Sequence, residues 1–253
     1  MKLLFIVLLF VSFSLSRTAV SCAVDKTVRL GYLDQPGSAL CLIAGEKGHY
    51  REEGLKVELI SFSDSRSGLT ALELGSIDAG AFEVGTVLTA IARGKEFRII
   101  AGGGVPVATG PLADLDNRVQ QKLDLTAIVV LIPATGVTTE KNTATRLTAA
   151  LIRAHRSRHE QPTFFPDPAG VDQTLTLFNP SPDYYRLERL WRQLDLQINA
   201  MPHDFLANHV YEEIYCDALD DLVDTYPNDR LLKELSGKVV CVPDCCPKNK
   251  NSK

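Results

Sequence analysis

The sequence predicts an α/β fold in which a parallel sheet is followed by C-terminal helices. Three observations support this prediction. Short apolar runs alternate with helical apolar periods between Thr27 and Gly104, the pattern of strand–helix–strand units. Helical periods dominate after residue 136. The chain of 253 residues is 45% apolar and 23% charged, which allows a buried core and excludes a disordered or collagen-like protein.

The expected elements of residues 22–135 alternate regularly. Each apolar run ends at a turn-forming residue, and each helix begins near a Ser or Thr and ends near a Gly. Because helices join the strands, right-handed crossovers would make the sheet parallel and cover both its faces. The expected strands are residues 28–33, 57–60, 77–82, 97–101 and 127–132, and the expected helices run from Ser38 to near Gly48 and over residues 65–74 and 86–92.

Residues 136–237 are expected to form a helical part that packs on the sheet. A Pro-rich connection at residues 161–168 separates the first two of these helices, because proline breaks a helix interior. The arginines of the first helix, Arg153, Arg156 and Arg158, predict a solvated basic face. The expected helices are residues 143–154, 183–196, 204–223 and 229–235, and a cysteine-containing tail follows over residues 238–253.

The first 21 residues have the pattern of a secretory signal peptide. Lys2 precedes an apolar run from Leu3 to Leu15, and small residues end just before Cys22. We expect export to the periplasm or to the outer face of the cytoplasmic membrane. Small residues before a Cys resemble a bacterial lipoprotein site, in which Cys22 carries the lipid that contacts the membrane. The alternative is an ordinary cleavage site; we favour lipidation because a free thiol is unusual in an oxidising compartment.

The charge of the chain argues against nucleic acid as a partner. Its 27 Lys and Arg residues face 31 Asp and Glu residues, and the net charge is −4 at pH 7. The basic residues are spread along the chain instead of forming a patch for a phosphate backbone. The sequence also lacks the common hydrolase, phosphate-loop and dinucleotide-binding motifs, so we expect neither enzyme activity nor a cofactor.

Three segments of the N-terminal half resemble a known family. Residues 46–59 read EKGHYREEGLKVEL, residues 72–80 read LELGSIDAG, and residues 91–102 read IARGKEFRIIAG. In this order and spacing they are similar to the first lobe of substrate-binding proteins of nitrate/sulfonate/taurine-type ABC importers. The resemblance implies a lobe of the periplasmic binding protein type II superfamily, a small-molecule solute and an ABC permease as partners.

The chain departs from that family after residue 104. Family members close a ligand between two lobes, whereas only about two dozen residues separate the fourth strand from the returning strand at Ala127. Most of the second lobe is therefore expected to be missing. Three alternatives follow: weak binding in a half-open site, a second chain that supplies the missing face, or loss of solute binding.

The predicted ligand site lies at the carboxyl ends of the first three strands. Ligands of parallel sheets bind there, where loops lead into helix N-termini that favour anions. Within this set, Cys41 has a second interpretation as a small buried residue of the helix interior. The candidate substrate-binding residues are Asp34, Gln35, Ser38, Cys41, Ser65, Arg66, Ser67, Glu83, Gly85 and Thr86.

The charge of these loops leaves the ligand class open. Asp34, Asp64 and Glu83 outnumber Arg66, so the rim is predicted to be net negative. This disfavours a simple anion and favours a zwitterion, an amine or a metal ion, unless the carboxylates only face water. The resemblance implies a sulfonate or nitrate, and the loop charges add an amine or pyrimidine-like molecule as a candidate solute.

The cysteines suggest a weaker alternative function. Cys241, Cys245 and Cys246 lie within six residues of the tail and are able to form disulfides, one of them with Cys216, or to hold a soft metal ion. Solute capture for an ABC importer is the preferred function. The alternatives are an accessory interaction protein that docks on a permease or a full-length binding protein, and a thiol-dependent metal carrier.

Overall fold

The computed structural model describes residues 27–104, 127–160, 179–198 and 205–238. The predicted signal peptide, Cys22 and the tail cysteines lie outside the described residues. The strands are β1 (Thr27–Leu33), β2 (Lys56–Phe62), β3 (Ala79–Glu83), β4 (Phe97–Gly104), β5 (Ile128–Pro133) and β6 (Asn179–Pro182). The helices are α2 (Ala39–Glu46), α3 (His49–Glu52), α4 (Ser65–Glu73), α5 (Val84–Ala92), α7 (Ala134–Thr139), α8 (Lys141–Glu160), α9 (Tyr184–Ile198), α10 (Glu212–Thr225) and α11 (Arg230–Lys238).

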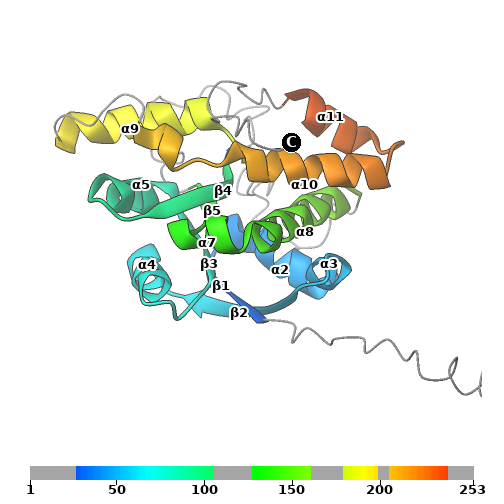
Figure 1. Cartoon of the computed structure of the whole chain (residues 1–253), viewed down its shortest axis with the longest axis horizontal. Helices are drawn as coiled ribbons and strands as arrows, with labels where there is room; N and C mark the ends of the chain where they lie inside the picture. The colour runs from blue at the N-terminus through cyan, green and yellow to red at the C-terminus, as the bar shows by residue number, and fades with distance from the viewer. Residues whose placement is uncertain (1–26, 105–126, 161–178, 199–204, 239–253) are drawn as a thin grey trace, which may run out of the picture.

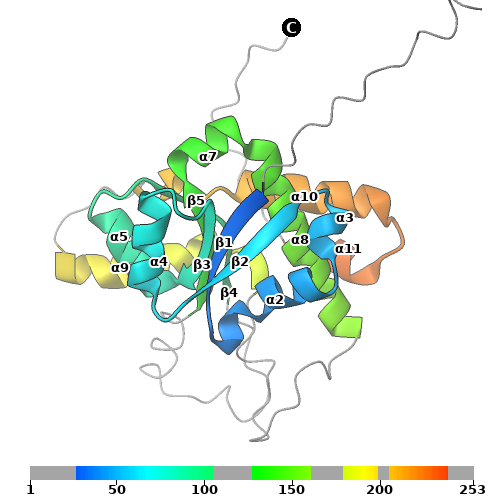
Figure 2. The same ribbon diagram turned by 90° about the horizontal axis from the view of Figure 1, so that it is seen from below.

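One six-stranded sheet stands between two layers of helices (Figure 1). Helices α4, α5 and α9 cover one face, and α2, α3 and α8 cover the other (Figures 1 and 2). Helices α10 and α11 pack outside α8. The α/β architecture with C-terminal helices is as predicted from the sequence. Within the described residues, none of the helices has the length and apolar character needed to cross a membrane.

The sheet is mixed, which corrects the prediction of a parallel sheet. Its strand order is β2-β1-β3-β5-β4-β6, and β1 is parallel to both β2 and β3. Strand β5 is antiparallel to its neighbours β3 and β4. The reason is that β5 begins at the edge where β4 ends, so it must run back across the sheet. The first four strands nevertheless share one direction, and their carboxyl ends define a single strand-end edge.

The helix predicted over residues 204–223 is interrupted. A 3-10 turn at Phe205–Asn208 is followed by a short extended stretch before α10. The Ile99 N–H donates to the His209 carbonyl at 2.7 Å, and the Tyr211 N–H donates to the Ile99 carbonyl at 2.8 Å. Residues 209–211 therefore pair with β4, and this pairing supplies the backbone hydrogen bonds that a continuous helix would have made.

Phe82 is the central packing residue of the N-terminal half. Its ring is fully buried and meets the Phe62 ring edge to face at a centroid distance of 5.9 Å. Glycines on two strands and a helix make room for it. A Cβ atom would lie 2.2 Å from the Phe82 ring at Gly68, 2.1 Å at Gly80 and 3.2 Å at Gly31. This ring therefore fixes how closely α4 approaches β1 and β3.

The helical C-terminal part is fastened to the N-terminal half through α8. Arg153 forms an ion pair with Glu53, and its Nη1 donates to the Tyr226 hydroxyl at 2.8 Å. The Tyr226 ring lies 5.1 Å from the Arg153 guanidinium and 5.0 Å from that of Arg156. Arg156 also pairs with Asp229. The prediction that these two arginines form a solvated face is wrong, because acidic and aromatic partners from α3 and the α10–α11 turn cover them.

We predict opposite effects for two helical Gly→Ala substitutions. Alanine normally favours a helix over glycine by about 1 kcal/mol. At Gly68 the added methyl group meets the buried Phe82 ring, so Gly68→Ala should lower the free energy of unfolding by about 1–3 kcal/mol in urea unfolding. Gly237→Ala in α11 has open space and should leave stability unchanged or raise it. Equal effects of the two variants would contradict this packing argument.

We also predict a graded loss of stability at Tyr226. Tyr226→Phe removes the hydroxyl that accepts from Arg153 and should lower the free energy of unfolding by about 1 kcal/mol. Tyr226→Leu also removes the ring between two guanidinium groups and should lower the free energy of unfolding by about 2–3 kcal/mol. Urea unfolding of both variants measures the difference. If the two variants are equally stable, the aromatic contacts contribute nothing.

Candidate functional site

The loops after β1, β2 and β3 meet at the strand-end edge. Leu33 at the end of β1 is level with Phe62 at the end of β2, and Tyr32 is level with Ala81 in β3. The second and third loops are in direct contact. The Glu83 N–H donates to Ser65 Oγ at 3.1 Å, and the same hydroxyl donates to a Glu83 carboxylate oxygen at 3.3 Å. Helix α2 leaves this edge toward one face of the sheet, and α4 and α5 leave it toward the other (Figure 1).

Ser38 occupies the start of α2 but does not cap it as predicted. Its φ of −92° and ψ of 4° are not the extended conformation of a capping residue, because a 3-10 turn at Pro36–Ser38 leads into the helix. The residue is 1% exposed, and its hydroxyl has no hydrogen-bond partner among the described residues. A buried hydroxyl without a partner destabilises a fold by about 1–3 kcal/mol. A polar ligand atom or water would satisfy it.

Asp64, and not Ser65 or Ser67, caps α4. Its carboxylate accepts from the Ser67 N–H at 2.9 Å and from the Ser67 hydroxyl at 3.1 Å. The backbone hydrogen bond from Ser67 is the main cause that lowers the pKa of Asp64 below its ordinary value. The Ser67 amide, the Ser67 hydroxyl and the Asp64 carboxylate are thus engaged with one another.

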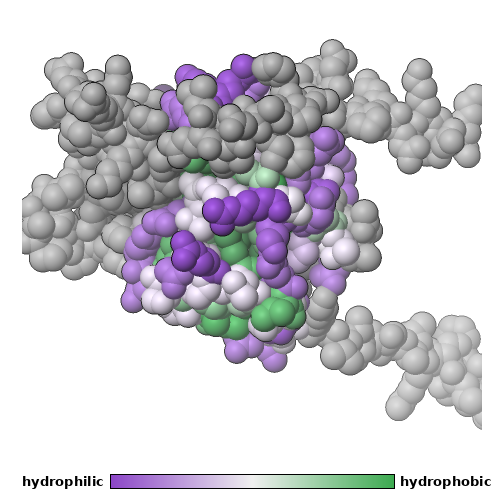
Figure 3. Space-filling model, turned by 90° about the vertical axis from the view of Figure 1, so that its left-hand side faces the viewer, coloured by the Kyte–Doolittle hydropathy of each residue, from purple (hydrophilic) through white to green (hydrophobic). Residues whose placement is uncertain are grey.

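A groove runs from the strand-end edge along the outer face of α4 and α5. Its volume is about 610 Å³, within the range of small-molecule sites, it is open to solvent along one side, and Leu194 of α9 forms part of its third wall. Figure 3 shows an apolar floor on this face between charged side chains. The residues that line it are Arg66, Leu69, Thr70, Glu73, Glu83, Gly85, Thr86, Thr89, Ala90, Arg93, Lys95 and Leu194.

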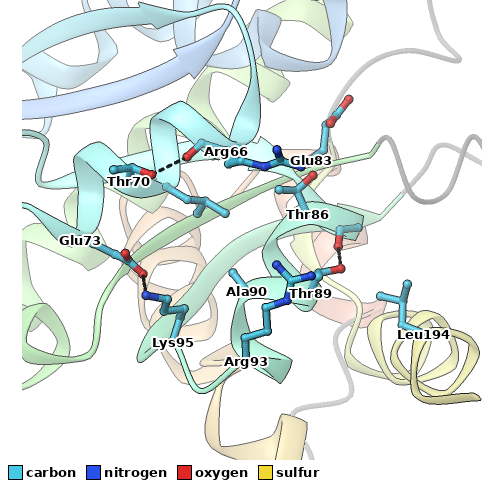
Figure 4. Close-up of a pocket in the computed structure, with 12 residues that line it drawn as sticks. Arg66, Thr70, Glu73, Glu83, Thr86, Thr89, Ala90, Arg93, Lys95 and Leu194 are labelled. Carbon is cyan, nitrogen blue, oxygen red and sulfur yellow. Dashed lines mark hydrogen bonds and ion pairs between the residues drawn. The ribbon is translucent and has the colours of Figure 1, made fainter. Parts of the chain in front are cut away.

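The charges of the groove differ from the prediction for the loops. Glu73 and Lys95 neutralise each other in an ion pair at 2.8 Å. Arg66 and Arg93 form no ion pair within the described part of the chain, and Figure 4 shows both side chains extending toward Thr86 and Thr89. Asp34 and Asp64 do not line the groove, so Glu83 is its only carboxylate outside an ion pair. The groove is therefore cationic instead of net negative.

Four of the ten predicted residues line the groove, namely Arg66, Glu83, Gly85 and Thr86. Asp34 and Gln35 lie in the first loop at the same edge, the former exposed and the latter half-buried. Cys41 does not reach it: the side chain is 1% exposed in the core, and burial raises the pKa of its thiol to about 12. The structure confirms the second interpretation, in which Cys41 is a small buried residue of the helix interior.

Eight residues that line the groove were not predicted from the sequence, and Thr89, Arg93 and Leu194 are the three among them that matter for a ligand. Thr89 and Arg93 lie three and seven residues after Thr86, so they share one face of α5. This spacing was available in the sequence. Leu194 was not predictable, because its place depends on how α9 packs against α5.

The cysteines give only partial evidence on the thiol alternatives. Cys216 is disulfide-bonded, as the sequence suggested, and Cys41 is free. The partner of Cys216 is therefore not among the described residues. In the part of the chain that the structure describes, no group of three His, Cys, Asp or Glu side chains is placed to hold a metal ion.

Comparisons with known proteins agree with the resemblance found in the sequence. Residues 23–118 match the model of the NMT1-like family. A Bordetella bronchiseptica protein is 17% identical with a TM-score of 0.57, and the match covers 80% of this chain and 98% of that chain. The periplasmic nitrate-binding protein NrtA of Synechocystis is 12% identical with a TM-score of 0.55, covering 78% and 89%. A periplasmic sulfonate-binding protein of Methylobacillus flagellatus is 12% identical with a TM-score of 0.55, covering 78% and 94%. No curated protein matches the sequence.

The Asp64 cap predicts a defined pH dependence. Because the pKa of Asp64 is lower in the folded protein, its stabilising effect is present above the unfolded pKa and is lost as the pH falls through the folded pKa. Wild type should therefore be more stable than Asp64→Ala at pH 7. The difference in free energy of unfolding should shrink as the pH falls below the ordinary pKa of aspartate. Urea unfolding at stepwise lower pH measures it. A difference that stays constant down to pH 3 would contradict the cap.

Proposed function

We propose, from the periplasmic-binding-protein fold that this chain shares with those solved structures, that it is the exported solute-binding component of an ABC importer. It captures a small polar organic molecule without covalent chemistry and delivers it to a permease. The observation that carries the proposal is the groove at the strand-end edge. Four residues selected from the sequence line it, and the edge is where ligands of this kind of sheet bind.

The charge of the groove supports an anionic or zwitterionic solute. Arg66 offers a guanidinium without a carboxylate partner among the described residues, and the Thr86 hydroxyl lies beside it (Figure 4). Such charge-assisted hydrogen bonds favour a sulfonate or nitrate. Glu83 at the same edge accommodates an ammonium group, so an aminosulfonate such as taurine satisfies both signs. An aminopyrimidine is the cationic alternative.

The described residues form one lobe around a single sheet, and this bears on how a solute is enclosed. The described residues contain a single sheet, and β4 ends and β5 begins at the strand-end edge. Within the described residues, a solute held at this edge is contacted by this one lobe. We propose that a second chain supplies the opposite face, and that the solute favours the closed arrangement because it contacts both faces there.

We also propose that Cys22 is lipidated after removal of residues 1–21. Two observations support this proposal. Small residues precede Cys22, and without the lipid Cys22 would be a free thiol in an oxidising compartment, which is unusual. Metabolic labelling with a fatty acid should give a labelled band in wild type and none in Cys22→Ser. A label in both, or in neither, would exclude the lipid anchor.

The accessory interaction protein is the second candidate function. The single sheet of the described residues favours it, because a lobe without its partner lobe is also what remains when solute binding has been lost. In that case the strand-end edge docks on a permease or on a full-length binding protein. The metal carrier is a weaker candidate, because Cys216 is disulfide-bonded and is therefore not a free thiol ligand.

Calorimetry separates these functions. The wild-type protein should bind taurine or nitrate in preference to an aminopyrimidine. Arg66→Gln should weaken binding roughly 10- to 150-fold by removing a charged hydrogen bond. Thr86→Val should weaken it about 2- to 12-fold, while Thr145→Val on α8 should have no effect. No heat with any of the three solutes, together with co-purification of a full-length binding protein, would overturn solute capture in favour of the accessory role.

A further inference from the structure

The groove is longer than a small inorganic ion or taurine requires. It extends from Arg66 to Glu73 on α4 and from Gly85 to Arg93 on α5. Seven residues of helix rise about 10 Å. The strand-end residues therefore occupy only one end of the groove, and the remaining length belongs to side chains farther along the two helices.

The floor of this groove is apolar. Leu69 of α4 is 6% exposed, and Ala90 of α5 and Leu194 of α9 are half-buried and lie in the groove. None of these side chains is able to form a hydrogen bond. A ligand body that contacts all three gains free energy by removing apolar surface from water, about 0.8 kcal/mol for each methylene group.

The far part of the groove carries a second cation beside polar side chains. Arg93 extends toward Thr89, whose hydroxyl donates to the Gly85 carbonyl at 2.7 Å and is therefore held in place (Figure 4). The neighbouring Lys95 is neutralised by Glu73 at 2.8 Å. Arg93 has no ion-pair partner within the described residues, so its guanidinium is available to pair with an anionic group of a ligand.

We infer that the solute is an amphipathic organic acid, with an anionic group held by Arg93 together with Arg66 and an apolar body lying on Leu69, Ala90 and Leu194. The juxtaposition that points to it is two guanidinium groups, from α4 and α5, on either side of Thr86 and Thr89 above an apolar floor. The inference rests on the proposed function and deepens it, because it assigns the solute class and adds an anchor outside the strand-end residues.

Titration calorimetry with linear carboxylates tests this inference. Wild type should bind butanoate, hexanoate and octanoate with a Kd that falls by up to about fourfold for each added methylene group. Hexylamine should bind at least tenfold more weakly than hexanoate, because its charge is opposite. Leu194→Ala should reduce the gain per methylene group and leave the butanoate Kd nearly unchanged.

Substitutions at Arg93 distinguish a direct contact between its guanidinium and the anionic group from a general effect of protein charge. Arg93→Gln should weaken hexanoate and butanoate binding equally, by roughly 10- to 150-fold. Arg93→Lys keeps a charge at the C-terminus of α5, where it favours the helix dipole, and should restore only part of the affinity. Arg51→Gln on the other side of the sheet is the matched control and should bind like wild type.

The outcomes distinguish this inference from the proposed function. If taurine or nitrate binds with dependence on Thr86 while no carboxylate binds, the inference fails and solute capture stands. The inference also fails if Arg93→Gln changes the hexanoate Kd by less than threefold, or if Arg51→Gln weakens it as much. If no solute of either panel binds, both proposals fail.

Discussion

The buried ring of Phe82 is the constraint on which the geometry of the site depends. Phe82 is the next-to-last residue of β3, and its ring fits into space that the glycines of β1, β3 and α4 leave open. Any side chain larger than hydrogen at Gly68 or Gly80 would push α4 outward. Because Glu83 and the first turn of α5 follow Phe82 directly, the same contact sets where the loops meet. The groove between α4 and α5 is thus a consequence of close packing beneath it.

Electrostatic pairing decides which of the many charged residues remain open to a ligand. Glu73 and Lys95 neutralise each other, and Asp64 is engaged with Ser67. What remains in the groove is a pair of arginines and the single carboxylate of Glu83. The amino-acid composition of the loops is net negative, yet the surface that a solute would contact is cationic. The sign of a site therefore follows from local partners more than from the number of charges nearby.

The sequence predicted the elements whose periods are regular. Strands β1 to β5 and helices α2, α4, α5, α8, α9, α10 and α11 all have an apolar pattern that identifies them, and four groove residues follow from the rule for strand ends. The misses have a common cause, since each depends on contacts between distant segments. The direction of β5, the interruption at His209–Tyr211, and the partners of Arg153 are set by tertiary packing. Even the cap of α4 required knowledge of backbone conformation to distinguish Asp64 from Ser65.

Leu194 gives the groove an unusual origin. Arg66 and Arg93 lie in the segment that matches a family model, residues 23–118. The groove wall formed by Leu194 belongs to α9 in the C-terminal part. Exchange of the later segment between homologous proteins would thus alter which molecular shapes are accepted while the sheet and its cations stay the same. Ligand preference in such a protein is able to diversify through a region that carries no recognisable motif.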